Sequence, residues 1–329
     1  AKDPFLNAYL QQLGEAVAAV VAAPEYRFQF RILNKKDLNA QAFPGGFIYV
    51  NLGLIQAVRN EGELAGVLAH EVGHVVARHG TKQLSRNQLV NGAIALGGTL
   101  VFGPAASPLT GLVTNLGKLS YSRWEEEQAD DLAVDYLYTV GYHPETMATF
   151  LDLMWQRRGE IHVVELISSH PLSEKRAARA RWRFSEWPLD SRWLYDTARF
   201  QEVKAFSRSA GHVLEGYSLL RKGDLAEAQD EFEKALAINP RNGEAHYGRA
   251  LALMRANLND LALGDLKIAI DLNPDLIEAY EALDGLLAQK GEWDAIAAYW
   301  TRYIELHPEN GKAYFERGGS YYRKGDTAH

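Results

Sequence analysis

Two histidines and a glutamate stand close together in the run His70-Glu71-Val72-Gly73-His74. If this run is helical, His70 and His74 lie one turn apart on the same face, because residues i and i+4 are neighbours on a helix. Both imidazoles can then bind one zinc ion at about 2.0–2.1 Å. Glu71 lies one step further round the helix, within reach of a water molecule on the metal. The zinc lowers the pKa of that water toward about 7, and the carboxylate can take its proton as it attacks a carbonyl group.

The alternative is a surface helix with two exposed histidines, since five-residue matches also arise by chance. The flanking residues argue against this alternative. Apolar side chains cover most sides of the segment: Leu64, Val67, Leu68, Val75 and Val76. Because two histidines and a carboxylate on a buried helix are costly unless they are paired or bound to metal, the segment predicts a metal site.

A catalytic zinc usually has three protein ligands and one open position. His79 is one candidate for the third ligand. However, the metzincin pattern requires a glycine three residues and a histidine six residues after the second histidine, where this chain has Ala77 and Gly80. We interpret His79 as a polar residue at the C-terminal end of the helix, where the helix dipole favours it.

The segment 122–130 (SRWEEEQAD) is the better source of a third ligand. Three adjacent glutamates on a helix point in directions about 100° apart, so only one can face the metal. Glu126 and Asp130 share one face with apolar residues of the next turn, and that face points inward. Glu126 is therefore the predicted ligand, and Asp130 is a carboxylate that orients a ligating histidine. The neighbouring glutamates are interpreted as solvated: Glu125 and Glu127.

With Ser169-His170-Pro171 and Arg176, these motifs resemble the metallopeptidase family of the CAAX prenyl endopeptidase. The segment 39–46 (NAQAFPGG) fits that family too. The resemblance implies a zincin-type endopeptidase with one zinc ion, Glu71 as catalytic base, Glu126 as third ligand and Arg176 as a residue that supports the ligands.

His170 has three possible roles. Its imidazole could stabilise the oxyanion, or it could bind the zinc ion itself and hold the enzyme latent. It could instead cap the helix that begins near Ser173. The motif favours a position near the site and leaves the first two roles open.

The substrate is expected to lie extended beside the second predicted strand and to pair through its backbone, which tolerates many sequences. The residues expected to form this substrate-binding strand are Pro44, Gly45, Gly46 and Phe47.

The elements that must position these residues indicate an α+β domain over residues 1–185, mainly helical. Strands are predicted at 28–33 and at 47–52, the second entered through a Pro-Gly-Gly turn. The predicted helices are 6–21, 61–78, 119–140, 144–157 and 173–184.

A connector is expected at 186–206, followed by an all-α repeat domain at 207–329. Pro240, Pro274 and Pro308 are 34 residues apart, and each ends an apolar helix. This spacing resembles the tetratricopeptide repeat and gives three repeats and a fourth, which we interpret as truncated. The third repeat departs from the pattern through large aromatic residues that we expect to be exposed: Trp293, Trp300 and Tyr303.

Within the family, the repeats resemble the soluble branch that acts in the bacterial periplasm on the assembly of outer-membrane β-barrels. The expected substrates are unfolded or misassembled envelope proteins, and the repeats could bind an envelope assembly machine. A second interpretation is a chaperone or adaptor whose repeats bind clients while the peptidase site is latent. Glu71 beside intact ligands favours the working enzyme, because a scaffold has no need of a base.

The composition limits the kinds of metal site, partner and membrane association that the chain can have. The absence of cysteine excludes a Cys-ligated zinc site and a disulfide framework. The net charge is −7, and neither half of the chain has a stripe of basic residues, so we expect no nucleic-acid partner. The first residues show no signal-peptide pattern. The segment 92–117 carries no charge and is long enough to span a bilayer. A single crossing would separate His74 from Glu126, so a lid or a loop in peripheral contact with a membrane remains, and we prefer the lid.

Overall fold

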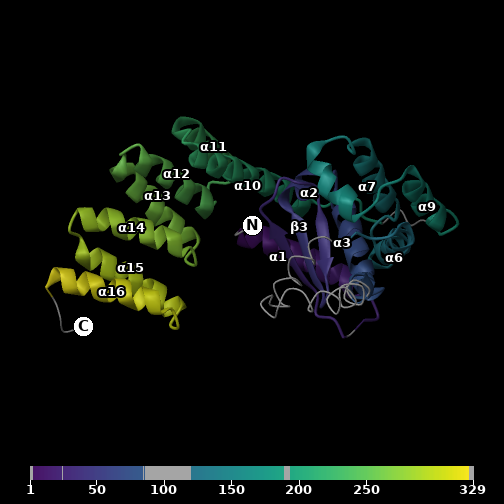
Figure 1. Ribbon diagram of the computed structural model, residues 1–329, viewed down its shortest axis with the longest axis horizontal. Coiled ribbons are helices and arrows are strands. Elements are labelled where there is room, and N and C mark those ends of the chain that lie inside the picture. Colours follow the sequence, from purple (N-terminus) through teal and green to yellow (C-terminus); the bar gives the residue numbers. More distant parts are fainter. Residues whose placement is uncertain (1–2, 24, 84, 86–119, 189–192, 326–329) are drawn as a thin grey trace, which may run out of the picture. The chain divides into compact units, whose positions relative to one another are not determined.

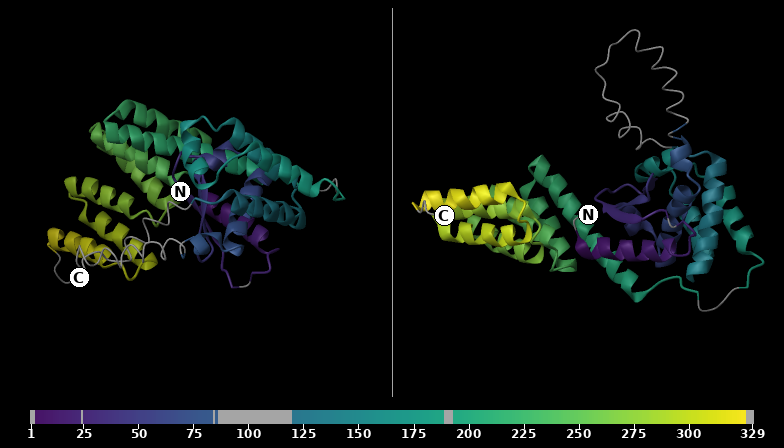
Figure 2. Two further views of the ribbon diagram at one scale, coloured as in Figure 1. Left: turned by 45° about the vertical axis from the view of Figure 1, so that its right-hand side comes forward. Right: turned by 90° about the horizontal axis from the view of Figure 1, so that it is seen from below.

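The computed structural model describes residues 3–23, 25–83, 85, 120–188 and 193–325. These residues form two compact units, one reaching from Asp3 to Ser207 and the other beginning at Arg208. Helices dominate both units, and the one sheet among the described residues lies in the first (Figures 1 and 2). This confirms the expected fold class, a mainly helical α+β domain followed by an all-α repeat domain. The uncharged segment 92–117 lies outside the described residues.

The elements of the first unit are, in chain order, α1 (Pro4–Ala18), β1 (Gln29–Leu33), β2 (Ala40–Phe43), β3 (Phe47–Asn51), α2 (Leu52–Ala57), α3 (Glu61–Val76), α6 (Arg123–Val140), α7 (Glu145–Gln156), η1 (Ile161–Val163), α8 (Val164–Ser169) and α9 (Glu174–Phe184). Helix α6 begins later than expected, because Ser122 caps it. The Ser122 side chain accepts the N–H of Glu125, and the Glu125 carboxylate accepts the N–H of Ser122. Glu125, predicted to be solvated, is therefore buried in this cap.

The sheet has three strands in the order β1-β3-β2, one more than expected. Strand β3 is central, because it pairs in parallel with β1 and antiparallel with β2. A substrate cannot pair beside β3 as predicted, since both edges of that strand are occupied. Gly45 and Gly46 instead form the turn of the β2–β3 hairpin at positive φ, and β2 is the edge strand.

Helix α3 is the central helix of the first unit. Every residue from Glu61 to Val75 is buried, and the Asn60 side chain caps the start by accepting the N–H of Glu63. Helix α6 packs against α3 at Gly73, where an added Cβ would lie 3.3 Å from the carbonyl oxygen of Ala129. The glycine inside the motif thus lets the two helices approach closely.

Part of the expected connector belongs to the first unit. Helix α10 (Ala198–Lys222) begins inside it, and Phe200 and Val203 are buried. The ammonium group of Lys204 donates to the carbonyl oxygen of Val58 at 2.7 Å, at the end of α2. Residues 198–206 are therefore packed helix instead of a free linker.

In the second unit, each helix packs against its neighbours in the chain. The helices after α10 are α11 (Leu225–Ile238), α12 (Gly243–Arg255), α13 (Asn259–Leu272), α14 (Ile277–Gln289), α15 (Trp293–Leu306) and α16 (Gly311–Lys324). Each repeat proline follows a helix end by two residues, as a proline after a C-terminus does. Successive helices stack side by side in all three views (Figures 1 and 2).

The aromatic residues of the third repeat are core residues, which corrects the expectation that they are exposed. Trp300 is 1% exposed and Tyr303 is 5% exposed, and both rings contact Tyr280. Trp293 is half-buried against the same core. Large rings fill space that small residues would leave open between these helices. Across the part of the chain that the structure describes, no helix is both long and apolar enough to cross a membrane.

Candidate metal centre

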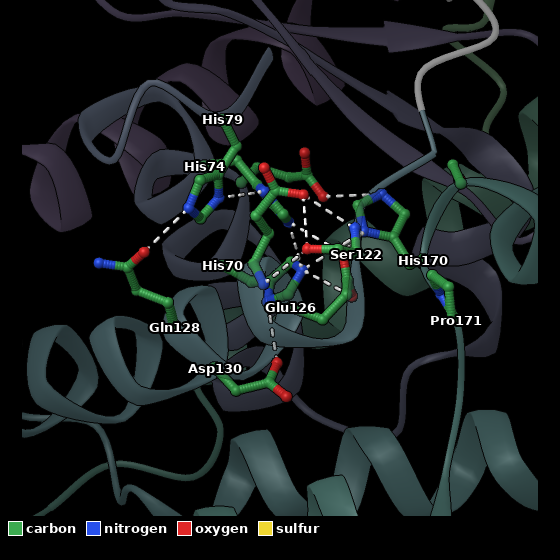
Figure 3. Close-up of polar contacts among 12 residues, drawn as sticks. His70, His74, His79, Ser122, Glu126, Gln128, Asp130, His170 and Pro171 are labelled. Carbon is green, nitrogen blue, oxygen red and sulfur yellow. Dashed lines mark hydrogen bonds and ion pairs between the residues drawn. The ribbon is translucent and has the colours of Figure 1, made fainter. Parts of the chain in front are cut away.

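Four donor atoms from three parts of the first unit converge on one point (Figure 3). His70 and His74 come from α3, Glu126 comes from the first turn of α6, and His170 follows α8. His70 Nε2 lies 3.0 Å from His74 Nε2 and 3.4 Å from His170 Nδ1. Glu126 Oε1 lies 3.2 Å from His74 Nε2 and 3.0 Å from His170 Nδ1. All four side chains are buried.

This donor set fits a zinc ion. Two ligands of a tetrahedral zinc lie about 3.3 Å apart when each bond is about 2.0–2.1 Å, and the four donor-to-donor distances above are close to that value. Three imidazoles and one carboxylate are also ligands that zinc accepts. Near them, Glu71 Oε2 and His170 Nε2 are buried without a hydrogen-bond partner, as expected where a bound group or water completes a site.

The ion pair of Asp130 and Arg176 lies behind His70. The Nδ1 atom of His70 lies 2.9 Å from Asp130 Oδ1, and Asp130 lies one turn after Glu126 on α6. Arg176 of α9 donates from Nε and Nη2 to Asp130, both at 2.7 Å, and its Nη1 lies 2.7 Å from Glu126 Oε2. Asp130 and Arg176, which the sequence analysis predicted as supporting residues, thus contact His70 and Glu126.

A different set of residues surrounds His74. Its Nδ1 lies 2.9 Å from Nδ1 of His79, and Nε2 of His79 lies 3.0 Å from Gln128 Oε1. The Tyr121 ring stacks on the His74 ring at 3.8 Å between centroids. His79 is therefore fully buried against a predicted ligand, which corrects its interpretation as a polar residue at a helix end.

The sequence analysis missed Tyr121 and Gln128 altogether. A signal existed for His79 alone, as a third histidine close to the motif. No periodicity shows that the chain turns back after α3, and nothing marks the residue just before Ser122 as the ring beside His74. Glu127, which the sequence analysis also interpreted as solvated, is half-buried, and its carboxylate lies 3.5 Å from the Arg179 guanidinium.

Charges within the cluster shift the pKa values of its members. Burial raises the pKa of Glu126, but the charges of His170 and Arg176 outweigh burial and hold it well below its usual range. Burial lowers the pKa of His74, which favours the neutral form that binds metal. Burial also raises the pKa of Asp130, and the Arg176 guanidinium reverses this and keeps it ionised.

Glu71 and His170 face each other across the cluster. His170 Nε2 lies 3.6 Å from Glu71 Oε1, and both side chains are buried. Burial lowers the pKa of His170, but the carboxylates of Glu126 and Glu71 outweigh it and raise the pKa above its ordinary value. His170 does not cap α9, whose first residue follows Ser173.

Two pockets open beside the cluster. The first lies between the end of β2 and the end of α3, and its lining includes Phe43, Gly45, His74 and Tyr121. The second lies behind Glu71 and His170, and its wall is mostly apolar. Its apolar lining residues are Ala40, Leu54, Val67, Met147, Phe150, Leu151, Leu166 and Leu172.

Comparison with known proteins gives two matching families. Peptidase family M48 matches residues 4–183, and the tetratricopeptide repeat matches residues 213–277 and 286–328. The beta-barrel assembly-enhancing protease of Escherichia coli O157:H7 is 30% identical over 285 residues, covering 83% of this chain and 56% of that protein. Its namesake from Yersinia pestis is 31% identical over 319 residues, covering 93% of this chain and 63% of that protein.

A more distant relative is the mitochondrial metalloendopeptidase OMA1 of Schizosaccharomyces pombe, which is 27% identical over 54% of this chain and 52% of its own length. The chain thus spans about half to two thirds of the length of these relatives. The family match covers more than half of the chain and includes every residue of the four-donor cluster. This chain belongs to peptidase family M48.

Proposed function

We propose that the protein is a zinc-dependent endopeptidase that hydrolyses peptide bonds in unfolded or misassembled proteins. The observation that carries the proposal is the buried convergence of His70, His74 and Glu126 beside Glu71. The three ligands would hold one zinc ion, which supplies a Lewis acid at the scissile carbonyl and lowers the pKa of water. The motifs also resemble those of the CAAX prenyl endopeptidase, while the tetratricopeptide repeats favour the soluble branch of the family.

Glu71 is the proposed general base. Its Oε2 is buried beside the donor cluster without a hydrogen-bond partner, so this oxygen is free to accept a proton from the attacking water. The protonated carboxyl can then give that proton to the amine that leaves when the peptide bond breaks. Its place on α3, one residue after His70, keeps it beside the ligands without using it as one.

His170 supports a latent resting state. If all four protein donors held the ion, no position would be left for substrate, whereas a catalytic zinc keeps one position open. We propose that the His170 imidazole withdraws when substrate binds and then faces the oxyanion. The same contact favours the second candidate function, a chaperone or adaptor whose peptidase site is mostly latent.

Substrate recognition is proposed to use the edge of β2. The outer edge of this strand is not paired with another strand of the described sheet. Pro44 and Gly45 of the hairpin turn line the first pocket, and the turn continues through Gly46 to Phe47 at the start of β3. Backbone pairing there would align an extended chain with the cluster and would tolerate many sequences.

We further propose a place in the bacterial periplasm or cell envelope, with clients or an assembly machine bound by the repeats. The names of the bacterial relatives support this proposal. Peripheral membrane contact through 92–117 remains a prediction from the sequence.

The decisive variant is Glu71→Gln in the whole chain. It should retain one zinc per chain and the native fold but lose peptide hydrolysis by at least about 10²–10⁴-fold, because the base is gone while the ligands remain. Casein digestion and metal analysis check this, with Glu126→Ala as the variant that should lose zinc. Cleavage by Glu71→Gln at the normal rate would rule out the mechanism.

A fragment ending at Ser207 separates the two candidate functions. Because a solenoid mainly contacts its own neighbours, the fragment should keep zinc and cleave a short peptide within about twofold of the whole chain. Cleavage of a misfolded protein client should fall. Equal losses on peptide and client would mean that the repeats are needed for the site itself.

A further inference from the structure

The two histidines of the motif are supported in chemically different ways (Figure 3). Behind His70 stands the carboxylate of Asp130, itself held by the Arg176 guanidinium. Behind His74 stands another imidazole, His79, with the amide of Gln128 behind it. One ligand is thus supported by a buried ion pair and the other by groups that carry no fixed charge.

The contact between His74 and His79 joins two nitrogens of the same kind, Nδ1 to Nδ1 at 2.9 Å. Such a contact is favourable only if one nitrogen carries the proton and the other accepts it. Because His74 uses Nε2 toward the donor cluster, its proton belongs on Nδ1. His79 Nδ1 then accepts, and its own proton lies on Nε2, from which it donates to Gln128 Oε1 at 3.0 Å. One proton arrangement satisfies every atom of the chain of contacts.

The backbone brings His79 to this place by an uncommon conformation. Helix α3 ends at Val76, and Arg78 adopts a left-handed conformation with φ of 58°. Arg78 and Asn257 are the two non-glycine residues with positive φ in the part of the chain that the structure describes. An L residue takes this conformation at a cost, and such residues gather at functional sites. Here the left-handed residue follows the end of α3, and the next residue packs behind His74.

The absence of charge in this support has a physical reason. The buried cluster already contains the carboxylates of Glu71, Glu126 and Asp130, and the Arg176 guanidinium is in contact with two of them. A fourth buried carboxylate behind His74 would add negative charge to the three already buried there and would be costly. An imidazole that accepts through Nδ1 orients His74 without adding negative charge.

We propose that His79 and Gln128 form a neutral relay that fixes the tautomer and the ring orientation of His74 and thereby strengthens zinc binding. Both are positioning residues, since His79 contacts the far side of the His74 ring and does not belong to the four-donor group. The proposal rests on the proposed function, because it assumes that His74 is a zinc ligand through Nε2.

The test measures the zinc dissociation constant of the whole chain by competition with a chromophoric chelator. His79→Leu removes the acceptor and should weaken zinc binding about 10–100-fold. His79→Asn keeps an amide oxygen near the position of Nδ1 and should return affinity to within about threefold of the original chain. Gln128→Leu frees the far end of the relay only, so its loss should lie between those two.

A structural role is separated by unfolding the zinc-free proteins in excess chelator. The proposal expects the unfolding temperature without zinc to change little, while the rise caused by zinc shrinks in His79→Leu. His246→Leu is the matched control, because it removes a buried imidazole that contacts Asp265 at 2.8 Å in the second unit. That variant should leave zinc affinity unchanged.

Three results would overturn the relay. These are unchanged zinc affinity in His79→Leu, equal losses in the Leu and Asn variants, or a loss in Gln128→Leu as large as that in Glu126→Ala. Failure of the proposed function looks different, since the unmodified chain would then bind no zinc or would keep it in Glu126→Ala. Zinc binding by the unmodified chain together with an inert His79→Leu removes the relay alone.

Discussion

The cores of the two units differ in the ionisable side chains that they bury. In the first unit, seven ionisable side chains lie together at 0–6% exposure: His70, Glu71, His74, Glu126, Asp130, His170 and Arg176. In the second unit, the hydrophobic core consists of alanine, valine, leucine, isoleucine and aromatic side chains. Burying charge costs stability unless every group is paired, whereas apolar burial stabilises in proportion to area. Buried ionisable groups of the second unit are few, such as the pair of His246 and Asp265 at 2.8 Å, whereas those of the first unit gather at the candidate metal centre.

Most ion pairs of the second unit lie on its surface, and some of them recur with the repeat. Lys290 pairs with Asp260, and Lys324 pairs with Asp294, each pair offset by 34 residues from the other. Exposed pairs of this kind contribute little, since solvent screens them and long side chains lose freedom. Charged pairs thus recur along the surface of the second unit, whereas the buried charges of the first unit gather in one cluster.

The largest effect is expected from Arg176→Met, which leaves the buried carboxylates of Asp130 and Glu126 without their cation. The zinc-free protein should lose about 3–5 kcal/mol of unfolding free energy in the first unit. Denaturant titration in chelator measures this loss. Arg179→Met is the matched control on the same helix, because its pair with Asp131 is partly exposed and should cost less than about 1 kcal/mol. Equal losses of unfolding free energy in both variants would mean that the buried ion pair contributes no more than the partly exposed one.

A smaller effect is expected from Gly248→Ala in the apolar core. A Cβ at this position would overlap the ring of Phe232, so the second unit should lose about 1–3 kcal/mol. Zinc content should stay the same, since the site lies in the other unit. Gly264→Ala is the control: nothing lies within 4 Å of its added Cβ, and helix propensity predicts a gain of about 0.5–1 kcal/mol. Chemical unfolding followed by circular dichroism separates the two signs.

The smallest effect is expected from Lys290→Ala, which removes one of the periodic surface pairs. We expect a change of about 0–0.5 kcal/mol in the second unit, and a smaller one at high salt. A loss above about 1 kcal/mol would mean that the surface pairs act as a network and that packing alone does not account for this unit.

Much of the first unit could be predicted from local sequence patterns. The i, i+4 spacing of His70 and His74 and of Glu126 and Asp130 fixes which side chains share a helix face, because that depends only on helical periodicity. The exact start of α6 could not be predicted, because the helix propensity of the preceding residues favours an earlier start than the Ser122 cap allows. Strand β2 was missed because four residues beside a Pro-Gly-Gly turn carry almost no periodic signal.

The repeats show the same division. Their 34-residue period and helix ends follow from the prolines, while the burial of Trp300 and Tyr303 depends on which helices face them. The repeat pattern usually has a small residue at such a position, so an aromatic residue there is predicted to be exposed. In the structure it fills the space between neighbouring helices.

The sequence by itself predicted the repeat, the candidate ligands and the candidate base, because each prediction depends on spacing within one helix or on a regular period. Tertiary structure alone decided that β3 is central, that residues 198–206 pack on the first unit, and that His79 and Tyr121 surround His74. These features depend on contacts between segments far apart in the chain or on the left-handed turn at Arg78. No local pattern records where such a turn directs the next side chain, because that direction depends on the helix already packed beside it.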